Sequence, residues 1–185
     1  MKTTPFWSSA VVLVLVAVSP GCREEPKTDN TPRASVTTQA DTNVQVVFAT
    51  EKLKRYQFPT HINDLVIDRA QSSYSEVFMV VIEPNKAPLY HKHDDTEQVF
   101  YVVEGTGVLT IGEQRRQFPV KPGDVVRIPV STLHSIKADA GKTLKYLCVD
   151  CFGEKPKAEP TWDDHVKAVC KTNGWDYNTV VASQH

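Results

Sequence analysis

The 185-residue sequence has almost no net charge and no long hydrophobic run. Its 21 Lys and Arg residues are balanced by 22 Asp and Glu residues, which leaves a net charge of −1 at pH 7. It therefore lacks the strongly basic surface with which proteins bind nucleic-acid phosphates or anionic lipid. Its strongly apolar run, residues 10–18, is shorter than the ~20 residues that a membrane-spanning helix needs. These absences argue against nucleic acid as a partner and against a membrane-spanning helix.

Cysteine is scarce as well, and no internal repeat is visible. The sequence has four cysteines, and no second Cys-x-x-Cys pair joins Cys148 and Cys151 to complete a four-cysteine zinc site. What is present fits one globular domain. Hydrophobic residues make up 41% of the chain and charged residues 23%, values that argue against wholesale disorder or a coiled coil. The length also suits a single domain.

Residues 1–21 have the pattern of a secretory signal peptide. Lys2 is the only charged residue in this segment, the apolar run at residues 10–18 follows it, and small residues precede Cys22. Gly21 directly before Cys22 resembles the cleavage box of bacterial lipoproteins, in which the cysteine becomes the lipidated first residue of the mature protein.

The residues on either side of Cys22 refine this expectation. One position departs from the lipoprotein box, because Ser19 stands where Leu or Val is usual. Residues 22–43 are polar, contain two prolines and have no apolar period, so they predict a disordered tether. We therefore expect an extracytoplasmic, periplasmic protein that is attached to the membrane only by a lipid anchor at Cys22.

From residue 44 onward the sequence consists of short apolar runs separated by turn signals. The runs have the length of strands, and residues such as Pro, Gly and Asn stand between them. Regularly spaced short strands with β-branched and aromatic residues predict an all-β sandwich or barrel over residues 44–152. The runs cover residues 44–49, 76–82, 99–103, 108–111, 125–128 and 143–149.

Residues 153–185 form an extension with a different pattern. Residues 162–172 are amphipathic, with Thr161 as a plausible N-cap and Asn-Gly just beyond the end, so they predict one short helix. Outside the cytoplasm, we expect a disulfide between Cys170 on this helix and Cys151, which would pin the extension onto the barrel. Cys148, within an apolar run, is expected to be a small buried hydrophobe.

Histidines at two places in the chain supply candidate chemistry. His91 and His93 are two residues apart, so on a strand they share a face with Cα atoms ~6.5–7 Å apart and can reach one metal ion. His134, just after a turn signal, offers a third imidazole. Exposed histidines at strand ends are common, so the His-x-His pair alone leaves both a metal site and a surface role open.

The context of these histidines resembles the cupin family. Residues 91–105, which include the segment FYVVEG, resemble the first cupin motif, and residues 122–134 resemble the second. Ser131 stands where glycine is usual, and Ala138 where an asparagine often follows the histidine. The resemblance covers residues 76–150. It implies a cupin double-stranded β-helix, which is a jelly-roll barrel, and a site for one divalent metal ion.

The family normally supplies a glutamate as fourth ligand, and both Glu97 and Gln98 stand near that place. Strand parity does not separate them, because the residues that would share either face are apolar. In the family pattern six residues stand between this ligand and the glycine that corresponds to Gly105, which gives Gln98; Glu97 is the alternative. Some metal cupins, including those that resemble pectin-degradation proteins opening unsaturated uronates, use glutamine there. The expected metal ligands are His91, His93, Gln98 and His134.

This ligand set has a chemical consequence. Three neutral imidazoles and an amide leave the charge of a divalent ion uncompensated, which favours polarising a carbonyl or hydroxyl over oxygen chemistry. Zinc, nickel, iron, manganese or copper would fit. We expect a non-redox metalloenzyme of the lyase, isomerase or hydrolase type, acting on a small oxygenated molecule such as a sugar or sugar acid. The alternative is a non-catalytic module that binds metal or a small ligand; a cupin dioxygenase fits less well.

Other residues near the motifs have two interpretations each. Tyr90 and Tyr101 are the candidate catalytic residues for proton transfer, and each also fits a packing role. Arg127 either binds a substrate carboxylate or lies on the solvated outer face. His61 and His165 lie outside the motifs and are expected to be structural or surface residues. The apolar positions around Tyr101 would permit a homodimer through the outer sheets.

Overall fold

A computed structural model describes residues 45–182 of the chain. The expected signal peptide (residues 1–21), the lipid anchor at Cys22 and the tether (residues 22–43) lie outside the described residues. Within residues 45–182, no helix combines the length and hydropathy that crossing a membrane requires.

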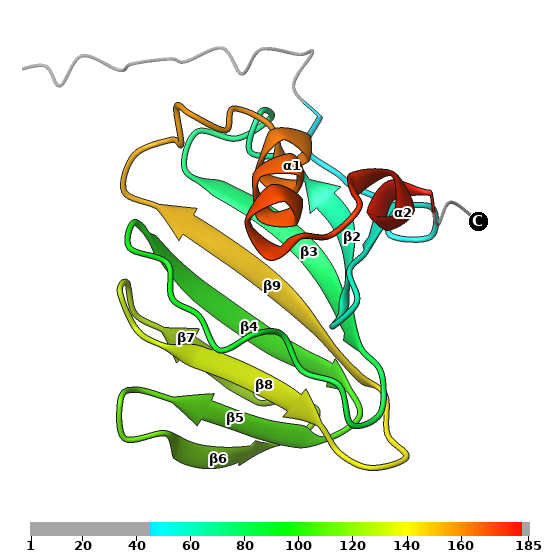
Figure 1. The fold of residues 1–185 in the computed structure, drawn as a ribbon, viewed down its shortest axis with the longest axis vertical. Coiled ribbons are helices and arrows are strands. Elements are labelled where there is room, and N and C mark those ends of the chain that lie inside the picture. Colours follow the sequence, from blue (N-terminus) through cyan, green and yellow to red (C-terminus); the bar gives the residue numbers. More distant parts are fainter. Residues whose placement is uncertain (1–44, 183–185) are drawn as a thin grey trace, which may run out of the picture. The chain divides into compact units, whose positions relative to one another are not determined.

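Two antiparallel sheets make up most of the described chain (Figure 1). The larger sheet has the strand order β1-β2-β3-β9-β4-β7, and the smaller has the order β6-β5-β8. Residues from both sheets belong to one hydrophobic core. The strands are β1 (Lys54–Gln57), β2 (Ile62–Ile67), β3 (Ser75–Ile82), β4 (Thr96–Glu104), β5 (Gly107–Ile111), β6 (Arg116–Val120), β7 (Val125–Ile128), β8 (His134–Ala138) and β9 (Leu144–Phe152). This all-β jelly roll is the fold that the sequence predicted.

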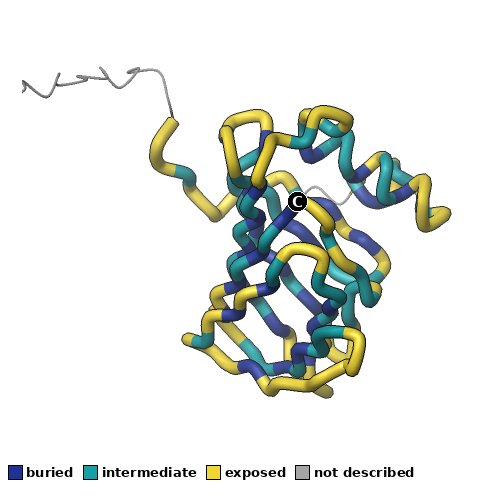
Figure 2. The backbone as a smooth tube through the Cα atoms, turned by 90° about the vertical axis from the view of Figure 1, so that its left-hand side faces the viewer, coloured by how far each residue is buried: buried dark blue, intermediate teal, exposed yellow. Residues whose placement is uncertain are grey.

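The strands alternate between buried and more exposed residues, because successive side chains point to opposite faces of a sheet. Along β4, Gln98, Phe100 and Val102 are buried whereas Tyr101 and Val103 are exposed. Figure 2 shows buried positions along the strands and exposed positions in the loops. The alternation settles which side chains of β4 face inward, a choice that the sequence left open.

Gly105, in the turn after β4, is required by its conformation and its surroundings. Its φ of 77° lies in the left-handed region that favours glycine. A Cβ at this position would also overlap the backbone carbonyl oxygen of Thr143. The turn after the FYVVEG segment therefore cannot accept a side chain without moving the residues that lead into β9.

Helix α1 (Trp162–Asn173) packs onto the large sheet, and the short helix α2 (Tyr177–Val181) follows it. Thr161 caps α1 by accepting a hydrogen bond from the backbone N–H of Asp164 at 3.1 Å. Trp162 lies on Phe78 with ring centroids 4.3 Å apart. The predicted C-terminal helix is therefore confirmed, and it covers the inner face of β3.

The disulfide expected between Cys151 and Cys170 is wrong. Both residues, like Cys148, are free cysteines. Cys151 lies on the opposite face of β9 from the buried Cys148. Cys170 lies on the buried side of α1, in the hydrophobic core. The extension is held instead by its apolar face and by Asp163, which accepts hydrogen bonds from Lys54 Nζ at 3.1 Å and Tyr56 Oη at 3.2 Å.

The strand prediction needs two further corrections. Residues 45–49 form no strand, and Val46 and Val47 are 82% and 79% exposed. Four strands were missed, namely β1, β2, β6 and β8. Their sequences carry several polar residues, so they lack the continuous apolar runs on which the prediction relied.

Candidate functional site

Two backbone hydrogen bonds bring the three motif histidines together. His91 N–H donates to the carbonyl of His134 at 3.1 Å, and His134 N–H donates to the carbonyl of His91 at 2.8 Å. This reciprocal bridge joins the loop before β4 to the start of β8. Potential ligand atoms of His91, His93 and His134 all lie within 4.8 Å of one another. Three imidazoles from separate parts of the chain are thus close enough to hold one ion after small side-chain adjustments.

The imidazole nitrogens are arranged for binding a cation. His91 Nδ1 lies 2.7 Å from the carbonyl oxygen of Leu89, and His134 Nδ1 lies 2.9 Å from that of Thr132. A carbonyl oxygen only accepts, so both Nδ1 atoms carry the proton and both Nε2 atoms offer a lone pair. His91 Nε2 lies 3.1 Å from His93 Nε2. This convergence of nitrogens fits a shared metal ion.

Burial keeps His93 and His134 uncharged at neutral pH. Burial, together with the neighbouring His91, lowers the pKa of His93 to about 3 and the pKa of His134 to about 4. A metal ligand must be the neutral imidazole. Two of the three side chains are therefore in the ligand form at neutral pH without first losing a proton.

Gln98 lines the same cavity as the histidines, whereas Glu97 does not. Gln98 is buried, and its Oε1 has no hydrogen-bond partner. Glu97 points to the outer face of β4, where it accepts a hydrogen bond from Arg127. A buried amide oxygen without a partner beside three imidazoles fits a metal site with glutamine as its fourth ligand; that Gln98 binds the ion stays a prediction.

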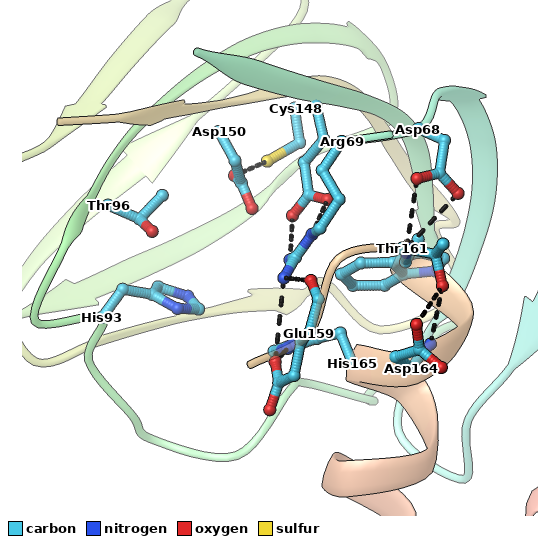
Figure 3. Close-up of polar contacts among 12 residues, drawn as sticks. Asp68, Arg69, His93, Thr96, Cys148, Asp150, Glu159, Thr161, Asp164 and His165 are labelled. Carbon is cyan, nitrogen blue, oxygen red and sulfur yellow. Dashed lines mark hydrogen bonds and ion pairs between the residues drawn. The ribbon is translucent and has the colours of Figure 1, made fainter. Parts of the chain in front are cut away.

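The cavity has a volume of about 570 Å³ and, besides the motif histidines and Gln98, a second group of polar lining residues, called here the second wall. Most of that wall comes from residues that the sequence analysis did not select. In Figure 3 the ring of His93 points toward the side where Glu159 and His165 lie. The titratable residues in the second wall are His61, Arg69, Glu76, Asp150, Glu159 and His165.

Arg69 is the buried cation of this second wall. Its Nε and Nη2 donate to the two carboxylate oxygens of Glu76 at 2.7 and 2.6 Å, and its Nη1 donates to the carbonyl of Glu159 at 3.3 Å. Its guanidinium lies 5.4 Å from the ring centroid of Phe152 and 5.6 Å from that of Trp162. Burial raises the pKa of Glu76 to about 7, against the lowering effect of Arg69. Three of the five N–H groups of Arg69 are therefore already engaged within the protein.

His165 reaches the cavity from the first turns of α1. Its Nδ1 donates to Glu159 Oε2 at 2.5 Å, and its ring stacks on Trp162 with centroids 4.8 Å apart. Burial lowers its pKa, and Glu159 opposes that shift. His165 follows Trp162 by three residues and precedes Val166, so helical periodicity places it beside the buried face. That periodicity was the available signal for its position.

The other candidate residues lie away from the cavity. Tyr90 donates its hydroxyl to the carbonyl of Gly112 at 2.5 Å, and Tyr101 is 48% exposed on the outer face of β4. Neither tyrosine is among the residues that line the cavity. Arg127 lies on the outer face with Glu97. By contrast, His61, expected to be structural, is part of the cavity wall, where burial lowers its pKa to about 3.

Comparison with known proteins identifies the family. The model of the cupin domain family matches residues 78–150. Residues 78–150 thus match a cupin domain, and the fold agrees with this match. An uncharacterized protein of Methanocaldococcus jannaschii is 35% identical over 68 residues, which cover 37% of this chain and 53% of that protein. The chain thus spans about half the length of this curated relative.

Two solved structures share the cupin fold. One, described as a predicted oxalate decarboxylase from Thermotoga maritima, is 17% identical with a TM-score of 0.52 and covers 57% of this chain and 98% of that chain. The other, an uncharacterized protein with a double-stranded β-helix domain from Klebsiella pneumoniae, is 16% identical with a TM-score of 0.52 and covers 60% of this chain and 94% of that chain. At this level of identity the likeness establishes the fold.

The cupin match does not contain the whole cavity. The three histidines, Gln98 and Asp150 lie within residues 78–150, whereas Arg69 and Glu76 precede that segment and Glu159 and His165 follow it. The end of the cavity that holds the histidine cluster thus lies within the matched segment. Much of the second wall is built by segments outside the match.

Proposed function

We propose that this cupin is a metal-dependent enzyme of the lyase, isomerase or hydrolase type that acts on a small oxygenated molecule such as a sugar or sugar acid. The observation that carries the proposal is the pair His165 and Glu159, which lines the same cavity as the histidine cluster. The sequence motifs alone offered candidate ligands but no firm proton-transfer group. We assign this role to His165 of the second wall.

His165 is suited to accept a proton. Its Nδ1 is committed to the carboxylate of Glu159, which orients the ring, and its Nε2 has no hydrogen-bond partner among the described residues. A neutral imidazole held in this way offers Nε2 as a general base. A divalent ion bound by His91, His93, His134 and Gln98 would supply Lewis-acid polarisation of a ligand carbonyl or hydroxyl oxygen.

The charges around Arg69 favour an uncharged substrate over an anionic one. The carboxyl groups of Glu76, Asp150 and Glu159 line the cavity beside this arginine. Arg69 already donates to Glu76 and to Glu159, so a ligand carboxylate would meet no unpaired guanidinium there. We therefore favour a neutral sugar or a similar hydroxyl-bearing molecule over a sugar acid.

The test begins with metal analysis of the purified chain by mass spectrometry. Wild-type protein should hold one divalent ion, and His91→Ala and His134→Ala should lose it. The same proteins are then assayed with matched pairs of sugars and uronic acids, such as glucose with glucuronate. His165→Ala should keep the metal and lose ~10²–10⁴-fold in turnover. The control Lys167→Ala, on the exposed side of α1, should keep both the metal and the wild-type turnover.

Three outcomes would count against the enzyme. Absence of bound metal in the wild type would remove the proposed site. Bound metal without turnover of any compound would favour the alternative, a non-catalytic binding module. Equal turnover by wild type and His165→Ala would remove the role assigned to His165.

From residues 1–43 we also propose that the domain works in the periplasm, where a lipid anchor at Cys22 attaches it to the membrane. The support is the signal-peptide pattern and the polar tether. In a Gram-negative host the chain should fractionate with membranes, and Cys22→Ser should release it into the soluble periplasmic fraction. Recovery of wild-type protein in the soluble fraction would contradict the anchor.

A further inference from the structure

Three buried polar side chains form a row across the large sheet beside the histidine cluster. Asp150 of β9 stands opposite Glu76 of β3 on one side and Gln98 of β4 on the other. Gln98 Nε2 donates to Asp150 Oδ1 at 2.8 Å. Cys148 Sγ, from the same face of β9, donates to the same oxygen at 3.1 Å, as Figure 3 shows. Asp150 Oδ1 therefore accepts from both Gln98 and Cys148.

This contact fixes which end of the Gln98 amide faces the cavity. A carboxylate oxygen accepts hydrogen bonds, and only the nitrogen of an amide donates them, so the –NH₂ group must face Asp150. The same nitrogen also lies 3.9 Å from Cys148 Sγ. The carbonyl Oε1 is left as the buried atom without a partner. A buried acceptor without a partner fits a site that a bound ion completes.

We propose that Asp150 is a positioning residue that holds Gln98 with its carbonyl oxygen toward the ion bound by His91, His93 and His134. This inference rests on the metal site proposed above. It also gives a physical reason for glutamine at a place where the family normally has glutamate. A glutamate at position 98 would bring two carboxyl groups together in the buried row, whereas Gln98 donates to Asp150 and keeps the negative charge one residue away from the ion.

The test measures Zn²⁺ affinity of the purified chain by competition with a chromogenic chelator. In Asp150→Asn, the new amide removes the obligatory acceptor and lets the Gln98 amide reverse, so the affinity should fall ~10–100-fold, as it does when groups that orient metal ligands are removed. Asp139→Asn is the matched control, because Asp139 is exposed and bonds only Thr106 through its side chain. Its affinity should equal that of the wild type.

A reciprocal exchange separates positioning from a general loss of structure. Gln98→Glu alone should unfold at a lower temperature because two carboxyl groups then face each other. In the double variant Gln98→Glu with Asp150→Asn, the asparagine donates to the new carboxylate, so both the melting temperature and Zn²⁺ affinity should recover to within several-fold of the wild type. Cys148→Val, which keeps the packing and removes the S–H donor, should weaken affinity in the same direction as Asp150→Asn.

The outcomes distinguish this inference from the metal site itself. If wild type and His91→Ala bind Zn²⁺ equally weakly, the proposed site fails and the role of Asp150 fails with it. If His91→Ala loses affinity but a folded Asp150→Asn keeps it, the site stands and the positioning role is overturned. Affinity in the double variant no better than in Asp150→Asn would overturn it as well.

Discussion

Trp162 of α1 lies on Phe78 of β3 with ring centroids 4.3 Å apart. This single contact places the first turn of the C-terminal helix against the inner face of the large sheet. His165, one turn further along α1, stacks on the same tryptophan. The Trp162 side chain therefore contributes both to the packing of the extension and to the arrangement of the second cavity wall.

Replacing Trp162 should destabilise the domain and disturb its cavity together. Trp162 is buried, so Trp162→Ala should lower the free energy of unfolding by ~3–5 kcal/mol, measured by urea denaturation. Trp162→Phe, which keeps an aromatic ring on Phe78, should lose much less. An effect of Trp162→Ala below ~1 kcal/mol would mean that α1 contributes little to the fold.

The pair Arg69 and Glu76 should behave as a buried ion pair. Their side chains are 4% and 1% exposed, so Arg69→Met would leave Glu76 buried without its partner and should lower stability by ~3–5 kcal/mol. The double variant Arg69→Met with Glu76→Leu should recover most of that loss. A double-mutant cycle by urea denaturation measures the coupling, and additive losses would show that the two side chains act independently.

Two glycines with similar φ values should respond differently to alanine. Gly105 and Gly112 have φ of 77° and 76°, which costs ~1–2 kcal/mol for any residue with a Cβ. A Cβ on Gly112 meets open space, whereas one on Gly105 overlaps the carbonyl of Thr143. Gly105→Ala should therefore lower the melting temperature well beyond the effect of Gly112→Ala. Equal effects would show that the segment containing Thr143, just before β9, moves freely.

Without bound metal, the buried histidines should make stability fall at acidic pH. The pKa of His134 is lowered from 6.5 to about 4 in the folded chain, so the unfolded chain binds the proton more readily. The stabilising effect of this shift is present above pH 6.5 and is lost as pH falls toward 4, with a limit of ~3 kcal/mol.

The difference between wild type and His134→Asn isolates this effect. Melting temperatures are measured with a chelator between pH 7.5 and pH 4.5, where the variant should lose less stability than the wild type. The comparison is needed because Glu76, with its pKa raised to about 7, acts in the opposite sense and stabilises the fold as pH falls below 7. Parallel curves for the two proteins would contradict the assignment.

The sequence was most informative where function depends on local spacing. His91 and His93 lie two residues apart and His134 lies in a recognisable second motif, so their convergence could be predicted, and the three side chains do meet. The choice between Glu97 and Gln98 could not be made from parity. The outer face of β4 is also apolar, with Tyr101 and Val103 exposed, so both faces carry the same pattern.

The second wall could not be predicted, because it depends on how distant segments pair. Glu76 and Asp150 are neighbours only through the register of β3 with β9, and Arg69 reaches Glu76 from the loop before β3. His165 enters the cavity only because α1 packs on Phe78 through Trp162. No motif marks these residues, and their charges alone would suggest an exposed surface.

The reciprocal bridge between His91 and His134 would link the release of an ion bound by the proposed site to opening of the backbone. Both of its hydrogen bonds join residues that also supply an imidazole. A fluctuation that breaks the bridge exposes two amides to solvent and draws the two rings apart in the same event. Deuterium uptake at these amides and the dissociation rate of an ion held there should therefore report one motion, and tight binding of the ion should slow both.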